Sequence, residues 1–311
     1  MRIIVTGGAG FIGSNIVDAY IEAGHEVAVI DNLSSGKEEN INPKARFYKI
    51  DIRSPEIDLV FAKEKPDVLN HHAAQIDVRK SVTDPMYDAS VNITGMVGLL
   101  QSCVKHGVKK VIFASSGGAI YGEPKILPAD ESTPLDPLAP YATSKIAGDY
   151  YLRCYSNLHG LKYTSLRYGN VYGPRQDPHG EAGVIAIFCQ AMHENREVKI
   201  FGTGEQLRDY VYVGDVVRAN LLALGSGDNE EINIGTAIGT SVNELFTRLK
   251  NIIGYQKDAV YYPPRQGELE RTYLANAKAK EVLGWEPLID IQRGLELTAA
   301  FFKEKLAREK V

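Results

Sequence analysis

The chain has 311 residues, of which 44% are hydrophobic and 24% are charged, and its formal net charge is −4. This is the composition of an ordinary globular protein, which excludes a disordered, collagen-like or low-complexity chain, and the length allows two domains. Lys and Arg number 35 against 39 Asp and Glu, so no basic surplus marks nucleic acid or an anionic membrane surface as a partner.

No targeting or membrane segment stands out in the sequence. The N-terminal apolar run, residues 3–5, is too short for a signal peptide and passes straight into glycines. No segment approaches the roughly 18 apolar residues that a membrane-spanning helix needs. The three cysteines fit neither a disulfide framework nor a CxxC pattern, which favours a reducing compartment. We therefore expect a soluble cytoplasmic protein.

Short β-branched runs alternate with helical patterns through the first half of the chain. The predicted strands are Arg2–Thr6, Glu26–Ile30, Arg46–Ile50, Val68–His71, Lys110–Ser115 and Tyr163–Tyr168. The predicted helices are Gly13–Ala23, Asp84–His106 and Tyr141–His159. Apolar strands that alternate with helices predict a doubly wound parallel sheet covered on both faces. Such sheets bind ligands at the carboxyl ends of their strands.

The second half of the chain is crowded with turns. Strands are predicted at Val198–Phe201 and Glu231–Ile234, and helices at Val184–Asn195, Val213–Leu224, Ser241–Ile253, Ala275–Leu283 and Gln292–Lys310. These elements predict a smaller mixed α/β lobe without a nucleotide-binding pattern of its own. The expected division is residues 1–172 for a dinucleotide-binding domain, to which later segments also contribute, and residues 173–311 for a substrate-binding lobe.

A glycine-rich turn connects the first strand to the first helix. Gly8, Gly10 and Gly13 satisfy the G-x-G-x-x-G pattern, in which glycine lets backbone N–H groups approach a pyrophosphate at a helix N-terminus. The second strand then ends in Asp31, whose carboxylate would bind the adenosine ribose and repel a 2′-phosphate, which favours NAD over NADP. An ordinary turn with a capping aspartate is the alternative. The residues expected to line this half of the cofactor are Gly7, Gly10, Phe11, Ile12, Gly13, Asp31, Asn32, Ser35, Gly36, Asp51 and Ile52.

The pattern Tyr-x-x-x-Lys occurs twice. One match, residues 121–125, contains a glycine and a proline and cannot form a helical turn. The other, Tyr141 to Lys145, opens a predicted helix, so the phenol and the ammonium share a face. The ammonium is expected to lower the pKa of the phenol from about 10, and such a tyrosine can remove a hydroxyl proton. A surface tyrosine beside a solvated lysine is the alternative.

Two further pairs of polar residues follow central strands. Ser115 and Ser116 end the fifth strand, where their hydroxyls face the expected nicotinamide site or merely begin a turn. His71 and His72 are adjacent on a strand, so they point to opposite faces and cannot chelate one ion. Because no Cys/His cluster supports them, we predict no metal site.

Together these elements resemble the extended short-chain dehydrogenase/reductase family, over nearly the whole chain. Within it the chain is similar to the NAD-dependent UDP-glucose 4-epimerases and related nucleotide-sugar epimerases. The segments that carry the resemblance are Thr6–Gly13, Asp31–Gly36, Tyr141–Lys145, Leu166–Arg175, Arg208–Val213 and Leu283–Trp285. The resemblance implies a Rossmann-type sheet, NAD as cofactor, a UDP-sugar as substrate, and a homodimer formed by the helices Asp84–His106 and Tyr141–His159.

The resemblance also implies roles for single residues. Tyr141 would be the base, Lys145 would bind the nicotinamide ribose and tune Tyr141, and Ser116 would bind the sugar's 4-oxygen. The segment after Ser116 is one residue longer than in most epimerases, so Ser115 is an alternative. Further cofactor contacts implied by the resemblance are Ala73, Ala74, Gln75, Asn92, Ser115 and Tyr168. Further substrate contacts are Asn170, Arg208, Arg265 and Thr272.

The resemblance leaves the sugar and the reaction open. Asn170, Arg208 and Arg265 match diphosphate positions, where guanidinium groups bind phosphate oxygens in pairs. Thr272 or Tyr273 would line the pocket beside the sugar's C2 substituent, and a threonine there would admit an N-acetyl group.

Two other activities are alternatives to epimerisation. A 4,6-dehydratase or decarboxylase of the same family is one alternative, but the dehydratases' Asp-Glu pair is replaced here by residues 117–118, both glycine. A non-catalytic NAD-binding regulator is the other. It is disfavoured because Tyr141, Lys145 and Ser116 are all present.

Asp31 should make the protein selective for NAD. Its carboxylate can accept hydrogen bonds from ribose hydroxyls but repels a 2′-phosphate. Apo-protein titrated with each dinucleotide and followed by fluorescence should therefore bind NAD more tightly than NADP. Tighter binding of NADP would contradict the assignment of Asp31 to the adenosine ribose.

Overall fold

The computed structural model describes residues 1–179, 183–264 and 269–308. Seven parallel strands form its central sheet, in the order β11-β6-β5-β4-β1-β2-β3. They are β1 (Arg2–Thr6), β2 (Glu26–Ile30), β3 (Arg46–Tyr48), β4 (Val68–His71), β5 (Lys110–Ser116), β6 (Lys162–Tyr168) and β11 (Glu230–Ile234). The strand order reverses between β1 and β4, which is the Rossmann arrangement, and sheets of this kind bind ligands outside the carboxyl ends of the strands at such a point. The predicted fold class is confirmed.

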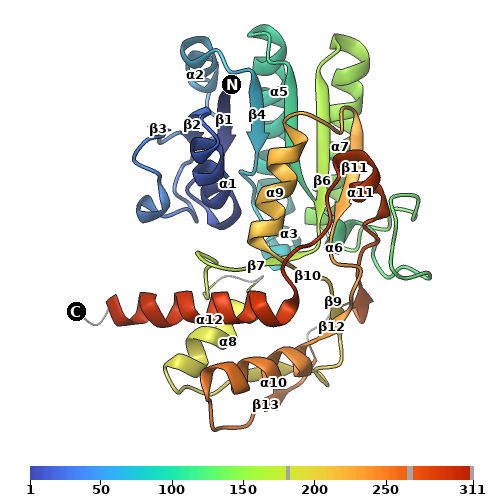
Figure 1. Cartoon of the computed structure of the whole chain (residues 1–311). Coiled ribbons are helices and arrows are strands. Elements are labelled where there is room, and N and C mark those ends of the chain that lie inside the picture. The colour runs from blue at the N-terminus through green and yellow to red at the C-terminus, as the bar shows by residue number, and fades with distance from the viewer. Residues whose placement is uncertain (180–182, 265–268, 309–311) are drawn as a thin grey trace.

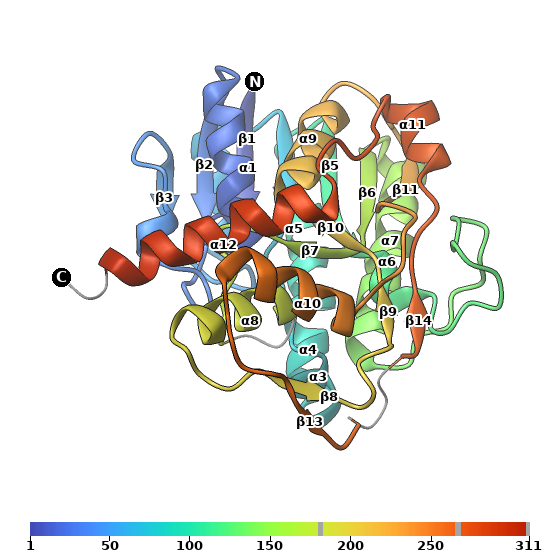
Figure 2. The same ribbon diagram turned by 60° about the horizontal axis from the view of Figure 1, so that its bottom comes forward.

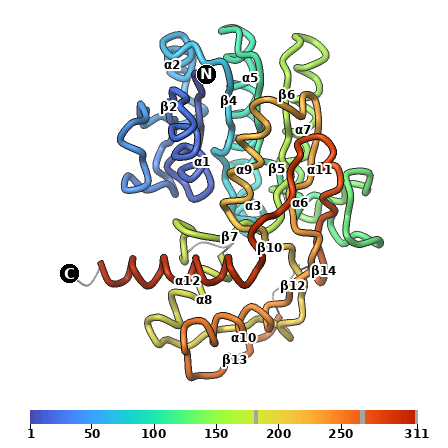
Figure 3. Tube along the Cα trace, in the orientation of Figure 1, coloured from blue at the N-terminus to red at the C-terminus, as the bar shows by residue number. Residues whose placement is uncertain are grey.

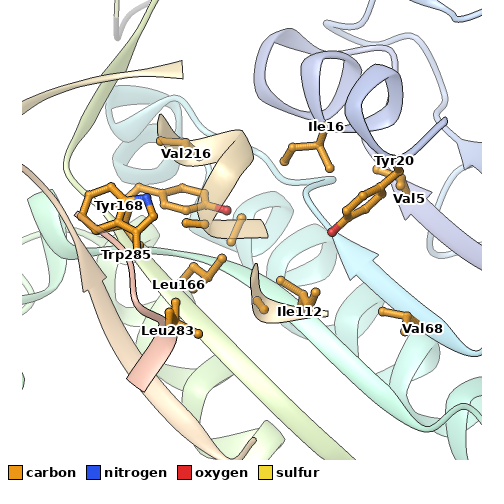
Figure 4. Close-up of a cluster of buried hydrophobic side chains, with 14 of the residues drawn as sticks. Val5, Ile16, Tyr20, Val68, Ile112, Leu166, Tyr168, Val216, Leu283 and Trp285 are labelled. Carbon is orange, nitrogen blue, oxygen red and sulfur yellow. The ribbon is translucent and has the colours of Figure 1, made fainter. Parts of the chain in front are cut away.

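Helices cover both faces of the sheet (Figure 1). One face carries α1 (Phe11–Glu22), α9 (Val213–Ala223) and α11 (Ala277–Leu283), and the other carries α2 (Ile57–Glu64), α5 (Met96–Lys105) and α7 (Pro140–His159). Figure 4 shows the first of these cores, where Ile16, Val216 and Trp285 pack with side chains of the sheet. Both strand faces are apolar because both are buried, as the sequence predicts for a parallel sheet.

The six strands predicted in the first half are confirmed, and their ends differ by at most two residues. The predicted helix Asp84–His106 is divided into α4 (Pro85–Ala89), a π-helical turn over Ser90–Gly95, and α5. Three short helices were not predicted: α2, α3 (Val78–Thr83) and α6 (Gly117–Ile120). Each has eight residues or fewer, too few to establish a clear helical period.

The smaller part of the molecule lies beyond the carboxyl ends of the strands (Figures 1 and 2). Its helices α8 (Val184–His193), α10 (Val242–Ile253) and α12 (Ile291–Arg308) share a third apolar core. Its strands form short ladders: β7 (Asn170–Tyr172) with β10 (Tyr210–Tyr212), β8 (Lys199–Phe201) with β13 (Val260–Tyr262), and β9 (Leu207–Arg208) between β12 (Thr240–Ser241) and β14 (Arg271–Thr272). The tube trace shows α12 lying across the view below the large sheet (Figure 3).

The strand predicted at Glu231–Ile234 does not belong to the smaller ladders. It is β11, which pairs with β6 at the edge of the large sheet, where Ile232 and Ile234 complete the core beneath α9 and α11. The division at residue 172 stays a prediction. Within the described residues, no helix combines the length and the apolar character needed to cross a membrane.

Candidate active site

The glycine turn is built so that only glycine fits at two of its positions. Gly7 has a φ of +72°, and a Cβ there would lie 2.6 Å from the backbone nitrogen of Ala73. A Cβ on Gly13 would lie 2.2 Å from the carbonyl oxygen of Gly7. The turn leads into α1, whose N-cap residue Gly10 supplies no side-chain hydrogen bond. The first N–H groups of this helix therefore suit an anionic ligand.

Asp31 lies beside this turn and is 8% exposed. One carboxylate oxygen accepts from the backbone N–H of Ala9 at 3.0 Å, and the other from Leu33 at 2.8 Å. Gly36 packs against the carboxylate, since a Cβ there would lie 2.9 Å from Oδ1. Each oxygen keeps a lone pair for a further donor such as a ribose hydroxyl.

Asn32 and Asp51 meet at the edge of this region. The Asn32 amide donates to Asp51 at 3.0 Å, and the Arg53 guanidinium donates to both carboxylate oxygens of Asp51 at 2.8 Å. These contacts with Arg53 hold the pKa of Asp51 well below its usual range. Of the neighbouring predicted residues, Ile52 is buried in the core and Ser35 is exposed.

The loop after β4 is held from beneath by a buried polar cluster. The Asn92 side chain accepts from the backbone N–H of Gln75 and donates to the Gln75 carbonyl, both at 2.9 Å. Asp88 accepts from both of their amides at 3.0 Å and from the Ser144 hydroxyl at 2.6 Å. The side chains of Gln75 and Asn92 thus have protein partners, and their direct contact with a cofactor stays a prediction. The sequence did not lead us to predict Asp88 or Ser144 as site residues. One signal was present for Asp88, because it stands four residues before Asn92 and so shares its helix face.

The end of β5 and the start of α7 bring Ser116 and Tyr141 together. The serine hydroxyl is a hydrogen-bond partner of the phenol. Lys145, one turn further along α7, is 5% exposed and donates to the carbonyl of Ala114 at 2.8 Å. Its Nζ lies 5.7 Å from the centroid of the Tyr141 ring. Ser115 is different, because its hydroxyl is buried and has no hydrogen-bond partner among the described residues.

The predicted lowering of the Tyr141 pKa is wrong for the protein by itself. Burial raises the pKa of Tyr141 to about 12, and the hydrogen bond from Ser116 offsets this only in part. Burial also lowers the pKa of Lys145 to about 8. The ammonium is directed at Ala114 rather than at the phenolic oxygen, so burial decides the sign. At neutral pH the phenol is protonated in this form.

Tyr168 and the two histidines lie in the interior. The Tyr168 phenol is enclosed in the core shown in Figure 4, accepts from Asn220 at 2.8 Å, and stacks on His72. His71 stacks on Phe113 instead, and burial lowers the pKa of both imidazoles to about 3. The cofactor contact expected of Tyr168 stays a prediction. Across the described part of the chain, no three His, Cys, Asp or Glu side chains are grouped to hold a metal ion.

The residues predicted to bind substrate come from three short strands. Asn170 opens β7, and its side-chain oxygen lies near Gly118, in the turn after Ser116. Arg208 and Thr272 are direct partners in the parallel β9–β14 ladder. The Arg208 guanidinium donates to the carbonyls of residues 207 and 269 at 2.9 and 2.7 Å. Arg265 lies outside the described residues.

Thr272 and Tyr273 are the two candidates for the residue that lines the pocket beside the sugar's C2 substituent, here called the gatekeeper. They face different surroundings. Thr272 is 2% exposed, whereas the Tyr273 ring packs against Gly239, where a Cβ would lie 2.8 Å from the ring. Both assignments therefore stay predictions.

Comparison with known proteins decides the family. The model of the NAD dependent epimerase/dehydratase family matches residues 3–235. The chain belongs to this family. It is 46% identical over 311 residues to the UDP-glucose 4-epimerase of Mycolicibacterium smegmatis, covering 98% of this chain and 99% of that protein.

Two solved structures of this family are very similar to the chain. A UDP-glucose 4-epimerase from Thermotoga maritima, solved with UDP-glucose, is 54% identical, with a TM-score of 0.97 over 98% of this chain and 100% of the other. One from Thermus thermophilus, solved with NAD, is 45% identical, with a TM-score of 0.94 over 97% and 99%.

NAD is the cofactor of this family, and the described residues suit it. The N-terminus of α1 offers N–H groups without a side-chain cap, and the neighbouring Asp31 carboxylate can accept from ribose hydroxyls. Tyr141 and Ser116 stand at the carboxyl edge of the same sheet, where the reactive end of a dinucleotide belongs.

Proposed function

We propose that this protein interconverts UDP-glucose and UDP-galactose by NAD-dependent epimerisation at C4 of the sugar. The observation that carries the proposal is the contact between Ser116 and Tyr141, with buried Lys145 one helical turn away. This group stands at the carboxyl edge of a sheet whose first turn suits a dinucleotide. The substrates named for the similar enzymes support the choice of UDP-sugar.

The chain's own residues handle the proton at the sugar's O4. NAD, when bound, supplies the hydride chemistry by accepting a hydride from C4 and returning it to the opposite face. Tyr141 removes the proton from the C4 hydroxyl and returns it, and Ser116 holds the same oxygen. The Tyr141 pKa of about 12 means that a phenolate needs positive charge nearby, which Lys145 and an oxidised nicotinamide ring would supply.

Dehydration is disfavoured by the lack of room for a side chain at position 117, as well as by the sequence. A Cβ at Gly117 would lie 2.5 Å from Cδ1 of Leu274, so the first carboxylate of the dehydratases' pair cannot be accommodated without moving that side chain. A decarboxylase would prefer a glutamate in the same turn, and none precedes Tyr121. The retained group of Tyr141, Lys145 and Ser116 argues against a regulator without catalysis.

A homodimer formed by the helical segment from α4 to α5 and by α7 belongs to the same proposal. On α7, the exposed residues Tyr151, Cys154 and Leu158 form one stripe at helical spacing, and Leu158 is 70% exposed. Such a stripe on a long helix suits a second copy of the chain. The three unpaired thiols fit the reducing cytoplasm.

Tyr141→Phe should reduce epimerisation by about 10²–10⁴-fold, because it removes the group that takes the O4 proton. Folding and NAD content should persist, since the ring remains. The measurement is NMR of the products formed from UDP-galactose, with Tyr150→Phe, at an exposed position on the same helix, as the matched control. Near-normal turnover by Tyr141→Phe would refute this mechanism.

The N-acetyl sugar should also be a substrate if Thr272 is the gatekeeper. We expect some activity on UDP-N-acetylglucosamine, which Thr272→Tyr should remove before the activity on UDP-glucose, because a phenol would overfill the pocket. Thr272→Val, of similar volume, controls for the buried position. If the wild type lacks N-acetyl activity, or if both activities fall in the same ratio, Thr272 is the wrong residue and Tyr273 takes its place.

Leu158→Glu should dissociate the proposed homodimer, because it puts a carboxylate into an apolar contact. Sedimentation velocity should show a dimer for the wild type and a monomer for the variant, with unchanged circular dichroism. Leu59→Glu, at a 69% exposed position on α2, is the control and should remain dimeric. A monomeric wild type, or a variant that stays dimeric, would exclude this interface.

A further inference from the structure

Asp209 is a buried carboxylate that the reaction does not use. It joins β9 to β10 and is 1% exposed. Among the ion pairs of the described residues, none includes it. A buried charge without a cation is costly unless hydrogen bonds replace its water, so its partners show what the charge holds in place.

Four donors converge on this carboxylate. One oxygen accepts from the backbone N–H of Thr236 at 2.8 Å and from its hydroxyl at 2.7 Å. The other accepts from the backbone N–H of Leu274 at 3.0 Å and of Ala237 at 3.3 Å. Burial raises the pKa of Asp209, while these donors oppose the rise. Gly235 allows the approach, since a Cβ there would lie 2.5 Å from the carboxylate.

Asp209 also connects the strands that carry the proposed substrate contacts. Its own carbonyl accepts from the backbone N–H of Asn170 at 2.6 Å. Arg208 is its chain neighbour, and Leu274, which it holds, follows Thr272 by two residues. The side chain of Leu274 in turn packs on Gly117, next to Ser116. Asn170 and Arg208 are thus one hydrogen-bonded or covalent step from Asp209, and Thr272 is three steps away through Leu274.

We propose that Asp209 is a positioning residue for the nucleotide-sugar site. Its carboxylate fixes β14 and the segment before β12 against β9, and its carbonyl fixes the start of β7, so that Asn170, Arg208 and Thr272 converge on one ligand. The inference rests on the proposed function, because it takes a UDP-sugar as that ligand.

The test is Asp209→Asn in the NAD-loaded enzyme. The substitution replaces one acceptor oxygen of the carboxylate by an NH₂ group. This group cannot accept from the backbone N–H groups that the oxygen bound, so those donors lose their partner. We expect the KM for UDP-glucose to rise about tenfold or more, with a smaller change in kcat, and NAD content to stay at the wild-type level. Direct calorimetric titration with UDP-glucose should show the same loss of affinity.

Asp215→Asn is the matched control. Asp215 is 2% exposed and also accepts from two backbone N–H groups, those of Leu288 and Ile289 at 3.0 Å, but it holds none of the substrate strands. It should lower the melting temperature and leave the KM unchanged. Thr236→Val, which removes one donor to Asp209, should raise the KM by a smaller factor and serves if Asp209→Asn does not fold.

The outcomes separate this inference from the proposed function. A raised KM in the variants at 209 and 236, but not at 215, supports positioning by Asp209. An unchanged KM at both 209 and 236, or an equal rise in the 215 variant, overturns it. If the wild-type enzyme itself neither binds nor converts UDP-glucose, the proposed function is wrong and this inference falls with it.

Discussion

The buried carboxylate of Asp88 links the two halves of the active site. It is fully buried and accepts hydrogen bonds from the loop after β4, through Gln75, and from α7, through Ser144. Ser144 stands between Tyr141 and Lys145 on that helix, so the helix that carries the proposed catalytic pair is fixed to the loop that borders the glycine turn. Because Asn92 binds both Asp88 and the loop backbone, neither half can shift without breaking several buried hydrogen bonds, each costly to leave unmade. The π-helical turn at Ser90–Gly95 contains Asn92, a distortion of the kind that recurs at functional sites.

Burial sets the protonation chemistry of this site more than the nearest charge does. The same enclosure raises the pKa of Tyr141 to about 12 and lowers that of Lys145 to about 8. Both shifts favour the neutral forms, but they differ in effect at neutral pH: the phenol stays protonated, whereas most of the Lys145 side chain keeps its positive charge. Asp88 adds a negative charge that opposes the phenolate and favours the ammonium. In the proposed mechanism, Tyr141 therefore needs the positive charge of the oxidised cofactor beside it before it can act as a base.

Local sequence signals predicted the parts of the fold that depend on short-range constraints. The glycine turn, the apolar strands and the Tyr141–Lys145 spacing are each readable within ten residues, and the strands form the sheet at whose carboxyl edge the glycine turn and the start of α7 lie. What the sequence could not supply depends on distant partners. β11 joins the large sheet through β6, more than sixty residues earlier in the chain, and no local pattern distinguishes it from the short strands around it. The sign of the Tyr141 pKa shift required the burial of the ring, which only the packed structure reveals.

The two parts of the active site are built with different kinds of rigidity. Tyr141, Lys145 and Ser116 are fixed by a seven-stranded sheet and a 20-residue helix, which suits the proposal that Tyr141 and Ser116 meet one oxygen atom of the sugar. Arg208 and Thr272 lie instead on strands of two residues each, which have too few ladder hydrogen bonds to hold a register alone. A buried carboxylate that gathers backbone N–H groups from several such segments replaces the missing strand length with charge-assisted hydrogen bonds. In the proposed site, Asp209 is the point at which these short segments are held together, because its carboxylate binds the backbone N–H groups of Thr236, Ala237 and Leu274 and its carbonyl binds that of Asn170.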